Sequence, residues 1–134
     1  INTFDKFSGL NRLELSRISM AAARQRAGRA GRTASGHCLR LWTEKENAML
    51  REYTLPEIAR VDLSACVLQL LEWGEADVEN FAWFEAPAKE SLYLALELLD
   101  RLDALSNGLL TDLGKRMARM PLQPRLARLV ITRI

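Results

Sequence analysis

Residues 25–32 read Gln-Arg-Ala-Gly-Arg-Ala-Gly-Arg and bring one amide and three guanidiniums together within eight positions. On a helix that turns about 100° per residue, Gln25, Arg29 and Arg32 fall within about 60° of one another. Two planar cations and an amide on one face suit a terminal phosphate, because guanidiniums match its oxygens with paired hydrogen bonds. The amide would orient an attacking water. Arginine fingers of this kind accelerate phosphoryl transfer by roughly 10³–10⁵.

Two glycines, Gly28 and Gly31, lie beside this predicted face and leave it free of side-chain bulk. Each costs about 1 kcal/mol relative to alanine inside a helix, so the pair suggests close approach of another backbone or of a phosphate. Arg26 points about 100° away and is interpreted as structural. The alternative is a basic helix that contacts nucleic-acid phosphate or pairs with acids on a partner.

The elements around this motif predict an incomplete α/β sheet. Residues 5–9 are rich in turn formers, and the leucines that follow predict a hairpin whose second strand ends at Ile18. Ser19 is a suitable N-cap for an alanine-rich helix that continues through Arg32 and stops near Ser35. Alternation over residues 37–43 predicts a further strand. An incomplete sheet would leave apolar area exposed around Leu13, Leu15 and Leu39, so self-association is expected.

From Glu44 onward the pattern is helical. Proline, N-cap and glycine signals divide it into a short helix at Pro56, two longer helices after Asp62 and Pro87, and two more that begin at Thr111 and Pro124. Their apolar stripes are Leu63, Val67, Leu70 and Leu71 on the first longer helix, then Leu92, Leu96, Leu99, Leu102 and Leu105 on the next. The sequence Ser-Asn-Gly at residues 106–108 predicts a tight turn. Three helices followed by a hairpin outline a winged helix.

Charge is unevenly distributed although the formal net charge is only +2. Acids outnumber bases eleven to two between Asp62 and Asp112, and basic blocks flank this region. Either the basic blocks contact a polyanion, with Lys115, Arg116 and Arg119 as candidates near the wing, or they are ordinary solvated faces.

The remaining candidate residues predict no further chemistry. Cys38 and Cys66 are expected to be buried free thiols, and His37 has no partners at metal-ligand spacing. Four large aromatic residues are expected in the core, with stacking on nucleic-acid bases as the alternative; they are Trp42, Trp73, Trp83 and Phe84. Since no apolar stretch approaches about 20 residues, we expect a cytoplasmic protein that does not bind membranes.

Residues 25–32 resemble motif VI of the DEAH/RHA branch of superfamily-2 ATP-dependent helicases. The resemblance extends to Ile18-Ser19, to Gly36 through Leu41, and to Pro56 through Arg60. It continues through residues 84–87, 108–114 and 117–124, and so covers nearly the whole chain. Residues 70–74, Leu-Leu-Glu-Trp-Gly, are most similar to the bacterial HrpB group.

The resemblance implies a division of the chain into three parts. Residues 1–43 would be the C-terminal part of the second RecA-like domain, residues 44–116 a winged-helix domain, and residues 117–134 the start of a helical ratchet domain. It also implies that Gln25 positions the lytic water while Arg29 and Arg32 contact the γ-phosphate.

ATP and Mg²⁺ would be bound mostly outside this segment, since the chain has no GxxxxGK[ST] phosphate loop and no DExH box. The segment alone is therefore expected to be inactive, whereas the full-length enzyme would hydrolyse ATP while moving along single-stranded nucleic acid, RNA more likely than DNA. Its other partners would be the remaining helicase domains. The alternative from the residues themselves is a non-enzymatic winged-helix module that binds nucleic acid.

Overall fold

The N-terminal strands form the expected hairpin. The computed structural model describes residues 1–5 and 9–133, and in it β1 (Asn2–Asp5) pairs antiparallel with β2 (Leu10–Leu13). The second strand ends at Leu13 rather than at the predicted Ile18. The middle of the turn predicted over residues 5–9 lies outside the described residues.

Helix α1 (Met20–Ala30) begins where the sequence predicts. The Ser19 hydroxyl accepts a hydrogen bond from the Ala22 amide at 3.2 Å, as an N-cap does. The prediction that the helix continues through Arg32 is wrong, because it ends at Ala30 with Gly31 as its C-cap. The chain then doubles back across the helix end. A Cβ atom added to Gly36 would lie 1.9 Å from the Ala30 carbonyl oxygen, so only glycine permits this approach.

The strand predicted over residues 37–43 is absent, and with it the strand–helix–strand sheet. Leu39 and Leu41 alternate as a strand would, but both side chains are exposed and no neighbouring strand pairs with them. A strand needs such a neighbour to satisfy its backbone groups. Within residues 1–5 and 9–133 the chain forms two separate two-stranded antiparallel sheets. The fold is therefore mainly helical with small sheets.

A capping box starts α2 (Glu44–Ala48). The Thr43 hydroxyl accepts from the Glu46 amide at 3.2 Å, and a Glu46 carboxylate oxygen accepts from the Thr43 amide at 2.9 Å. The following segment returns to α1, where the amides of Met20 and Ala21 donate to the carbonyls of Arg51 and Glu52 at 2.8 and 2.9 Å. The short helix expected at Pro56 is present as the 3₁₀ turn η1 (Glu57–Ala59).

The C-terminal half is a helical unit with a small hairpin. It contains α3 (Ser64–Glu72), α4 (Lys89–Arg101), β3 (Leu105–Ser106), β4 (Leu109–Leu110), α5 (Asp112–Ala118) and α6 (Pro124–Thr132). The predicted turn signals are confirmed: Asn107 and Gly108 both have positive φ, and the Thr111 hydroxyl caps α5 by accepting from the Gly114 amide at 3.0 Å. Helix α5 ends at Ala118, with Arg119 as its C-cap.

One hydrophobic core joins these helices. Val67, Leu99, Ala104 and Ala127 are fully buried, and Met117 is nearly so. The other buried members of the cluster are Leu63, Leu68, Leu70, Val78, Leu92, Ala95, Leu105, Ala118 and Ile131. The predicted leucine stripes are thus buried in the core or packed against it, but the second stripe extends beyond its helix, because Leu102 is the C-cap of α4 and Leu105 lies in β3. Helix α6 shares the core of the preceding helices.

Several residues expected in the interior lie outside it. Trp73 is 77% exposed and Phe84 is fully exposed, whereas Trp42 and Trp83 are half-buried. Trp73 follows the end of α3, and Phe84 lies in the loop before α4, so neither belongs to an apolar stripe. Cys38 and Cys66 are free but exposed, so the prediction that they are buried is wrong.

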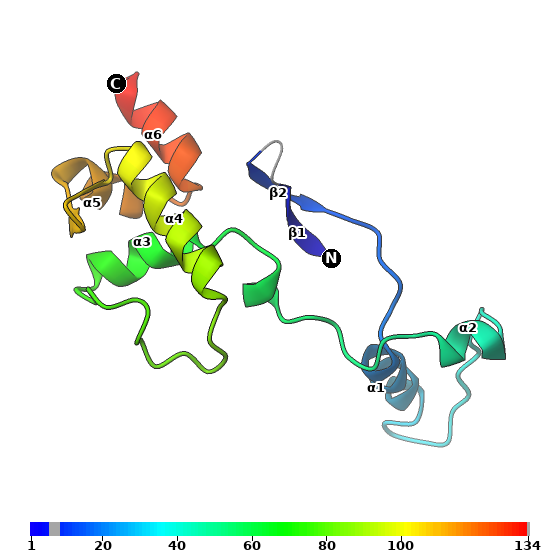
Figure 1. The fold of residues 1–134 in the computed structure, drawn as a ribbon. Helices are drawn as coiled ribbons and strands as arrows, with labels where there is room; N and C mark the ends of the chain where they lie inside the picture. Colours follow the sequence, from blue (N-terminus) through cyan, green and yellow to red (C-terminus); the bar gives the residue numbers. More distant parts are fainter. Residues whose placement is uncertain (6–8, 134) are drawn as a thin grey trace.

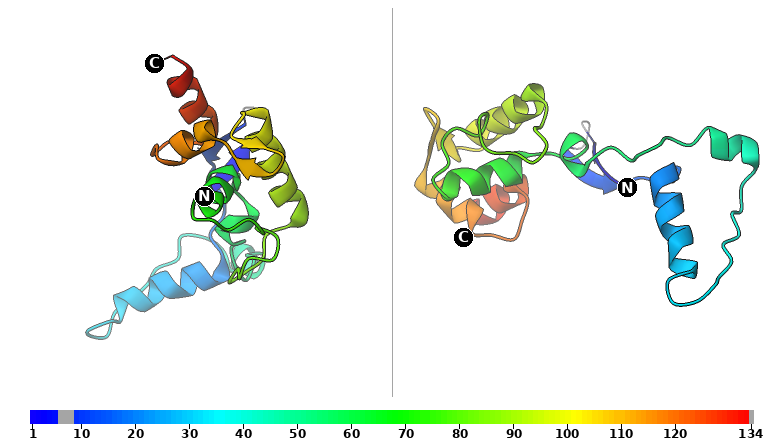
Figure 2. Two further views of the ribbon diagram at one scale, coloured as in Figure 1. Left: turned by 90° about the vertical axis from the view of Figure 1, so that its left-hand side faces the viewer. Right: turned by 90° about the horizontal axis from the view of Figure 1, so that it is seen from below.

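The N-terminal and C-terminal halves of the chain lie at opposite ends of the molecule (Figures 1 and 2). The helical unit occupies one end, α1 and α2 occupy the other, and the β1–β2 hairpin lies between them (Figures 1 and 2). No helix within residues 1–5 and 9–133 is long and apolar enough to cross a membrane.

Candidate functional site

The predicted phosphate-binding side chains lie at the solvent-facing, C-terminal part of α1. Gln25 and Arg29 are on the helix, and Arg32 follows one residue after its Gly31 C-cap. All three residues are exposed, and none of their side chains forms a hydrogen bond or ion pair within the described part of the chain. The structure therefore keeps the three in one short segment, but the position of Arg32 is set by the turn after α1 rather than by helical geometry.

The glycines of this segment leave open space beside the three side chains. A Cβ atom at Gly28 would meet no described atom within 4 Å, and one at Gly31 would meet only the Ala34 carbonyl oxygen at 4.0 Å. Arg24 and Arg26 are also exposed, and their side chains also lack hydrogen bonds and ion pairs among the described residues. The surface is thus strongly cationic, and no carboxylate among the described residues pairs with it.

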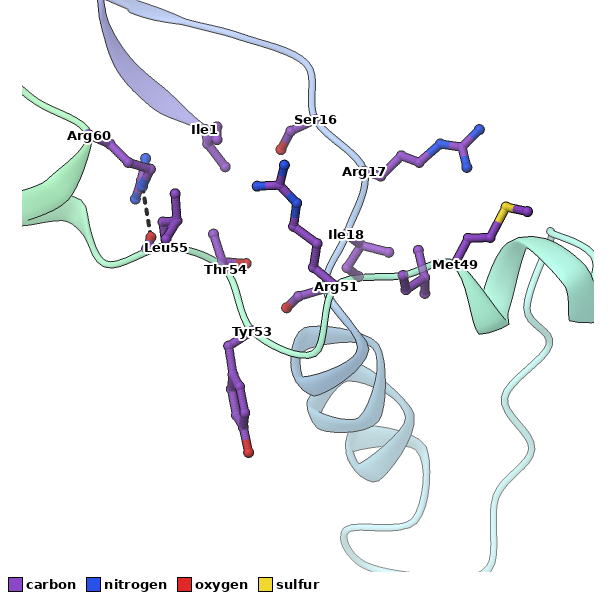
Figure 3. A pocket seen from close by; sticks show the side chains of 12 residues that line it. Ile1, Ser16, Arg17, Ile18, Met49, Arg51, Tyr53, Thr54, Leu55 and Arg60 are labelled. Carbon is purple, nitrogen blue, oxygen red and sulfur yellow. Dashed lines mark hydrogen bonds between the residues drawn. The ribbon is translucent and has the colours of Figure 1, made fainter.

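A pocket of about 330 Å³ lies at the other end of α1 (Figure 3). It is formed by three segments that are distant in sequence, which is why spacing along the chain gave no signal for it. Its lining consists of Ile1, Ser16, Arg17, Ile18, Ser19, Met49, Leu50, Arg51, Tyr53, Thr54, Leu55 and Arg60.

The pocket has cations but no acid or histidine in its lining. Arg60 is already engaged, since its guanidinium donates to the Leu55 carbonyl at 2.8 Å and to the Asn2 carbonyl. The lining thus offers no pair of groups for acid–base catalysis. We interpret the pocket as the junction of the segments that support α1.

The cations predicted near the wing are exposed on α5 and just after it. Lys115 lies 3.4 Å from an Asp112 carboxylate oxygen, and Arg119 lies 3.7 Å from Glu72. Arg116 forms no hydrogen bond or ion pair with the described residues. Two of the three candidate cations are therefore partly neutralised by neighbouring acids. Among the described residues, no group of three or more His, Cys, Asp or Glu side chains is placed to bind a metal.

Comparison with known proteins identifies the chain. The helicase-associated (HA2) winged-helix family matches residues 95–122, which span the end of α4, the β3–β4 hairpin and α5. The ATP-dependent RNA helicase prp22 of Schizosaccharomyces pombe, a pre-mRNA-splicing factor, is 43% identical over 134 residues and aligns with 98% of this chain. The chain belongs to the DEAH/RHA helicase family.

Solved structures of this family agree with that assignment. A crystal structure of the Escherichia coli DEAH/RHA helicase HrpB matches 98% of the chain with a TM-score of 0.87 and 36% identity. A second structure, described as the E. coli DExH-box NTPase HrpB, matches with a TM-score of 0.82 at the same identity. The chain spans only 11% of the prp22 sequence and 16–17% of the HrpB chains. It thus corresponds to a small part of these DEAH/RHA proteins.

Proposed function

We propose that this chain is the part of an ATP-dependent helicase that carries its arginine fingers. Arg29 and Arg32 contact the γ-phosphate of ATP, and Gln25 positions the attacking water. The rest of the protein contributes most of the site for ATP and Mg²⁺ and moves along single-stranded nucleic acid, for which we propose RNA in preference to DNA. Residues 1–43 belong to the second RecA-like domain and residues 44–116 to the winged helix. Residues 117–134 begin the ratchet domain, which shares its core with the winged helix through α5.

One observation carries this proposal: Gln25, Arg29 and Arg32 are exposed together and have no partner in the described part of the chain. Long cationic side chains that served only the fold would be expected to cover apolar surface or to pair with acids. The open space at Gly28 leaves room for a ligand beside them.

The donor set suits the phosphate end of ATP rather than its metal. Guanidiniums and an amide donate hydrogen bonds to phosphate oxygens, whereas Mg²⁺ requires oxygen ligands such as carboxylates. Bound Mg²⁺ would supply further neutralisation of the phosphate charge. This chain's residues would stabilise the charge that spreads over the γ-phosphate oxygens in the transition state.

The test is Arg32→Ala in the full-length protein. We expect ATP turnover to fall at least about a hundredfold, or about 2.7 kcal/mol of barrier. Arg26→Ala is the matched control, because it removes another exposed arginine from the same short segment. A similar loss in both variants, or normal turnover with Arg32→Ala, would contradict the finger role.

A non-enzymatic winged-helix module that binds nucleic acid is the second candidate. It is supported by the HA2 winged-helix match and by the exposed Arg116 on α5. Normal turnover in the Arg32 variant, together with tight and salt-sensitive duplex binding by residues 1–134, would favour it.

A further inference from the structure

We propose that Arg125 is a positioning residue that links the helical unit to the β1–β2 hairpin and, through it, to α1. The inference rests on the proposed function, because the consequence of the link is to set how α1 is held. The group of contacts that Arg125 makes with Phe4, Gly9 and Asp62 is called here the hairpin joint.

Arg125 lies in the first turn of α6 and spans two parts of the molecule with one nitrogen. Its NH1 group donates to the Gly9 carbonyl at 2.7 Å and lies 3.3 Å from a carboxylate oxygen of Asp62. Its guanidinium carbon lies 6.0 Å from the centre of the Phe4 ring, within the range of a cation–π contact. Gly9 and Phe4 belong to the hairpin, whereas Asp62 precedes α3.

Asp62 forms hydrogen bonds both at the start of α3 and with the hairpin. Its carboxylate accepts from the Ser64 amide at 3.0 Å and from the Ser64 hydroxyl at 2.7 Å, which fixes it at the start of α3. Its own amide donates to the Asn11 side-chain oxygen at 3.3 Å, which adds a second link to the hairpin. The Asp62 side chain is only 14% exposed and that of Arg125 is 34% exposed. Such a sheltered pair is fixed more firmly than a surface ion pair.

Gly9 shows how closely the hairpin approaches Arg125. Its φ of +67° is a conformation that side-chain-bearing residues rarely adopt, and an added Cβ atom would lie 3.0 Å from the Arg125 guanidinium carbon. The backbone of the hairpin therefore lies directly against the arginine, with no intervening side chain.

The joint is polar because the hairpin contributes little to the core. The hydrophobic cluster and the residues packed against it begin at Ile58, and the hairpin leucines Leu10 and Leu13 are 39% and 85% exposed. Among the described residues, hydrogen bonds and a cation–π contact hold the hairpin against the helical unit, while the ion pair with Asp62 fixes Arg125 within that unit. Contacts of this kind can shift without exposing core residues.

From the hairpin, the link continues to α1. The Phe4 amide donates to the Arg60 carbonyl at 2.8 Å, and Arg60 bonds in turn to the Leu55 carbonyl at 2.8 Å. This segment begins at Arg51, whose carbonyl accepts from the first amide of α1. Residues 14–19 also connect β2 to α1 along the chain. Displacement of the helical unit would therefore pull on the helix that carries Gln25 and Arg29.

The test compares basal and nucleic-acid-stimulated ATP turnover in the full-length protein. With Arg125→Ala we expect the stimulated rate to fall roughly threefold or more, the scale of a coupling change, while the basal rate stays within about twofold because Arg125 does not touch the proposed ATP-contact residues. Arg125→Lys should restore most of the stimulation, since a single ammonium can replace the one nitrogen that makes both polar contacts.

Arg128→Ala is the matched control. Arg128 lies one turn later on α6 and also bonds to a carbonyl and an acid, Leu102 at 3.0 Å and Asp103 at 2.9 Å, but both belong to the helical unit. We expect this variant to be less stable without a change in the ratio of stimulated to basal turnover. An equal change of that ratio in both variants would overturn the proposal.

A distance measurement tests the joint without using activity. Spin labels placed on the exposed positions Leu13 and Leu129 report the separation of hairpin and helical unit. We expect Arg125→Ala to broaden this distance distribution and Arg128→Ala to leave it unchanged. An unchanged distribution with Arg125→Ala would overturn the joint even if Arg32→Ala abolished turnover. A broadened distribution with a normal Arg32 variant would instead overturn the proposed function alone.

Discussion

At the scale of single residues, a substitution at Gly28 is expected to change the stability of α1 and the proposed activity in opposite directions. Nothing described lies within 4 Å of a Cβ atom there, so we expect Gly28→Ala to stabilise α1 by about 0.5–1 kcal/mol. In the full-length protein, hydrogen exchange of the α1 amides should become slower in the absence of nucleotide. ATP turnover should nevertheless fall by about tenfold or more, because the methyl group would occupy space proposed for the nucleotide.

Gly36→Ala provides the contrast, because its methyl group would collide with the Ala30 carbonyl oxygen. That variant should lose protection at the end of α1 and activity together. If Gly28→Ala kept full turnover, the space beside α1 would need no ligand, and the pair of glycines would have to be explained by folding alone.

At the scale of elements, the sequence predicted those whose signals are local. Ser19, Thr111 and the Asn107-Gly108 turn act where they were expected, because a cap or a tight turn is decided by neighbouring residues. The prediction of a strand over residues 37–43 is wrong because alternating apolar and polar residues do not provide a neighbouring strand to pair with. The end of α1 was misplaced for a related reason, since the chain that crosses it at Gly36 is outside the helical pattern.

The capping box of α2 was missed, although Thr43 followed three residues later by Glu46 is its sequence signature. The amide and then the hydroxyl of Thr43 lower the pKa of the Glu46 carboxyl below its ordinary value. Because the folded pKa is the lower one, this stabilisation is present above the unfolded pKa and disappears as the pH falls through the folded one.

We therefore expect the Thr43 amide to titrate in NMR spectra with an apparent pKa below about 4.3, the usual glutamate value. In Glu46→Gln the amide should be insensitive to pH in this range. A titration at or above the usual glutamate value in the unaltered protein would show that the capping bond is not populated.

At the scale of the whole molecule, the candidate site and the core lie in different halves. The core, from Leu63 to Ile131, could be predicted from apolar stripes because its helices pack against each other within the chain. The hairpin joint could not, since Gly9 and Arg125 are separated by 116 positions and meet through backbone and charge rather than through a repeating pattern. The orientation of α1 relative to the helical unit therefore required the structure.

The expectation that apolar area is exposed in the N-terminal half is confirmed, with Leu13 and Leu39 each 85% exposed and Leu15 fully exposed. Exposed leucines of this kind promote association. The isolated segment of residues 1–134 should therefore show a weight-average mass that rises with concentration in light scattering. Replacing Leu13, Leu15 and Leu39 with serine should shift it toward the monomer, because less apolar area would be removed from water on association.

The same number of serines at Tyr93, Leu94 and Leu109, which are exposed on the helical unit, should have a smaller effect. A monomer at every concentration, with a single sharp unfolding transition, would mean that these leucines are covered within the chain in solution.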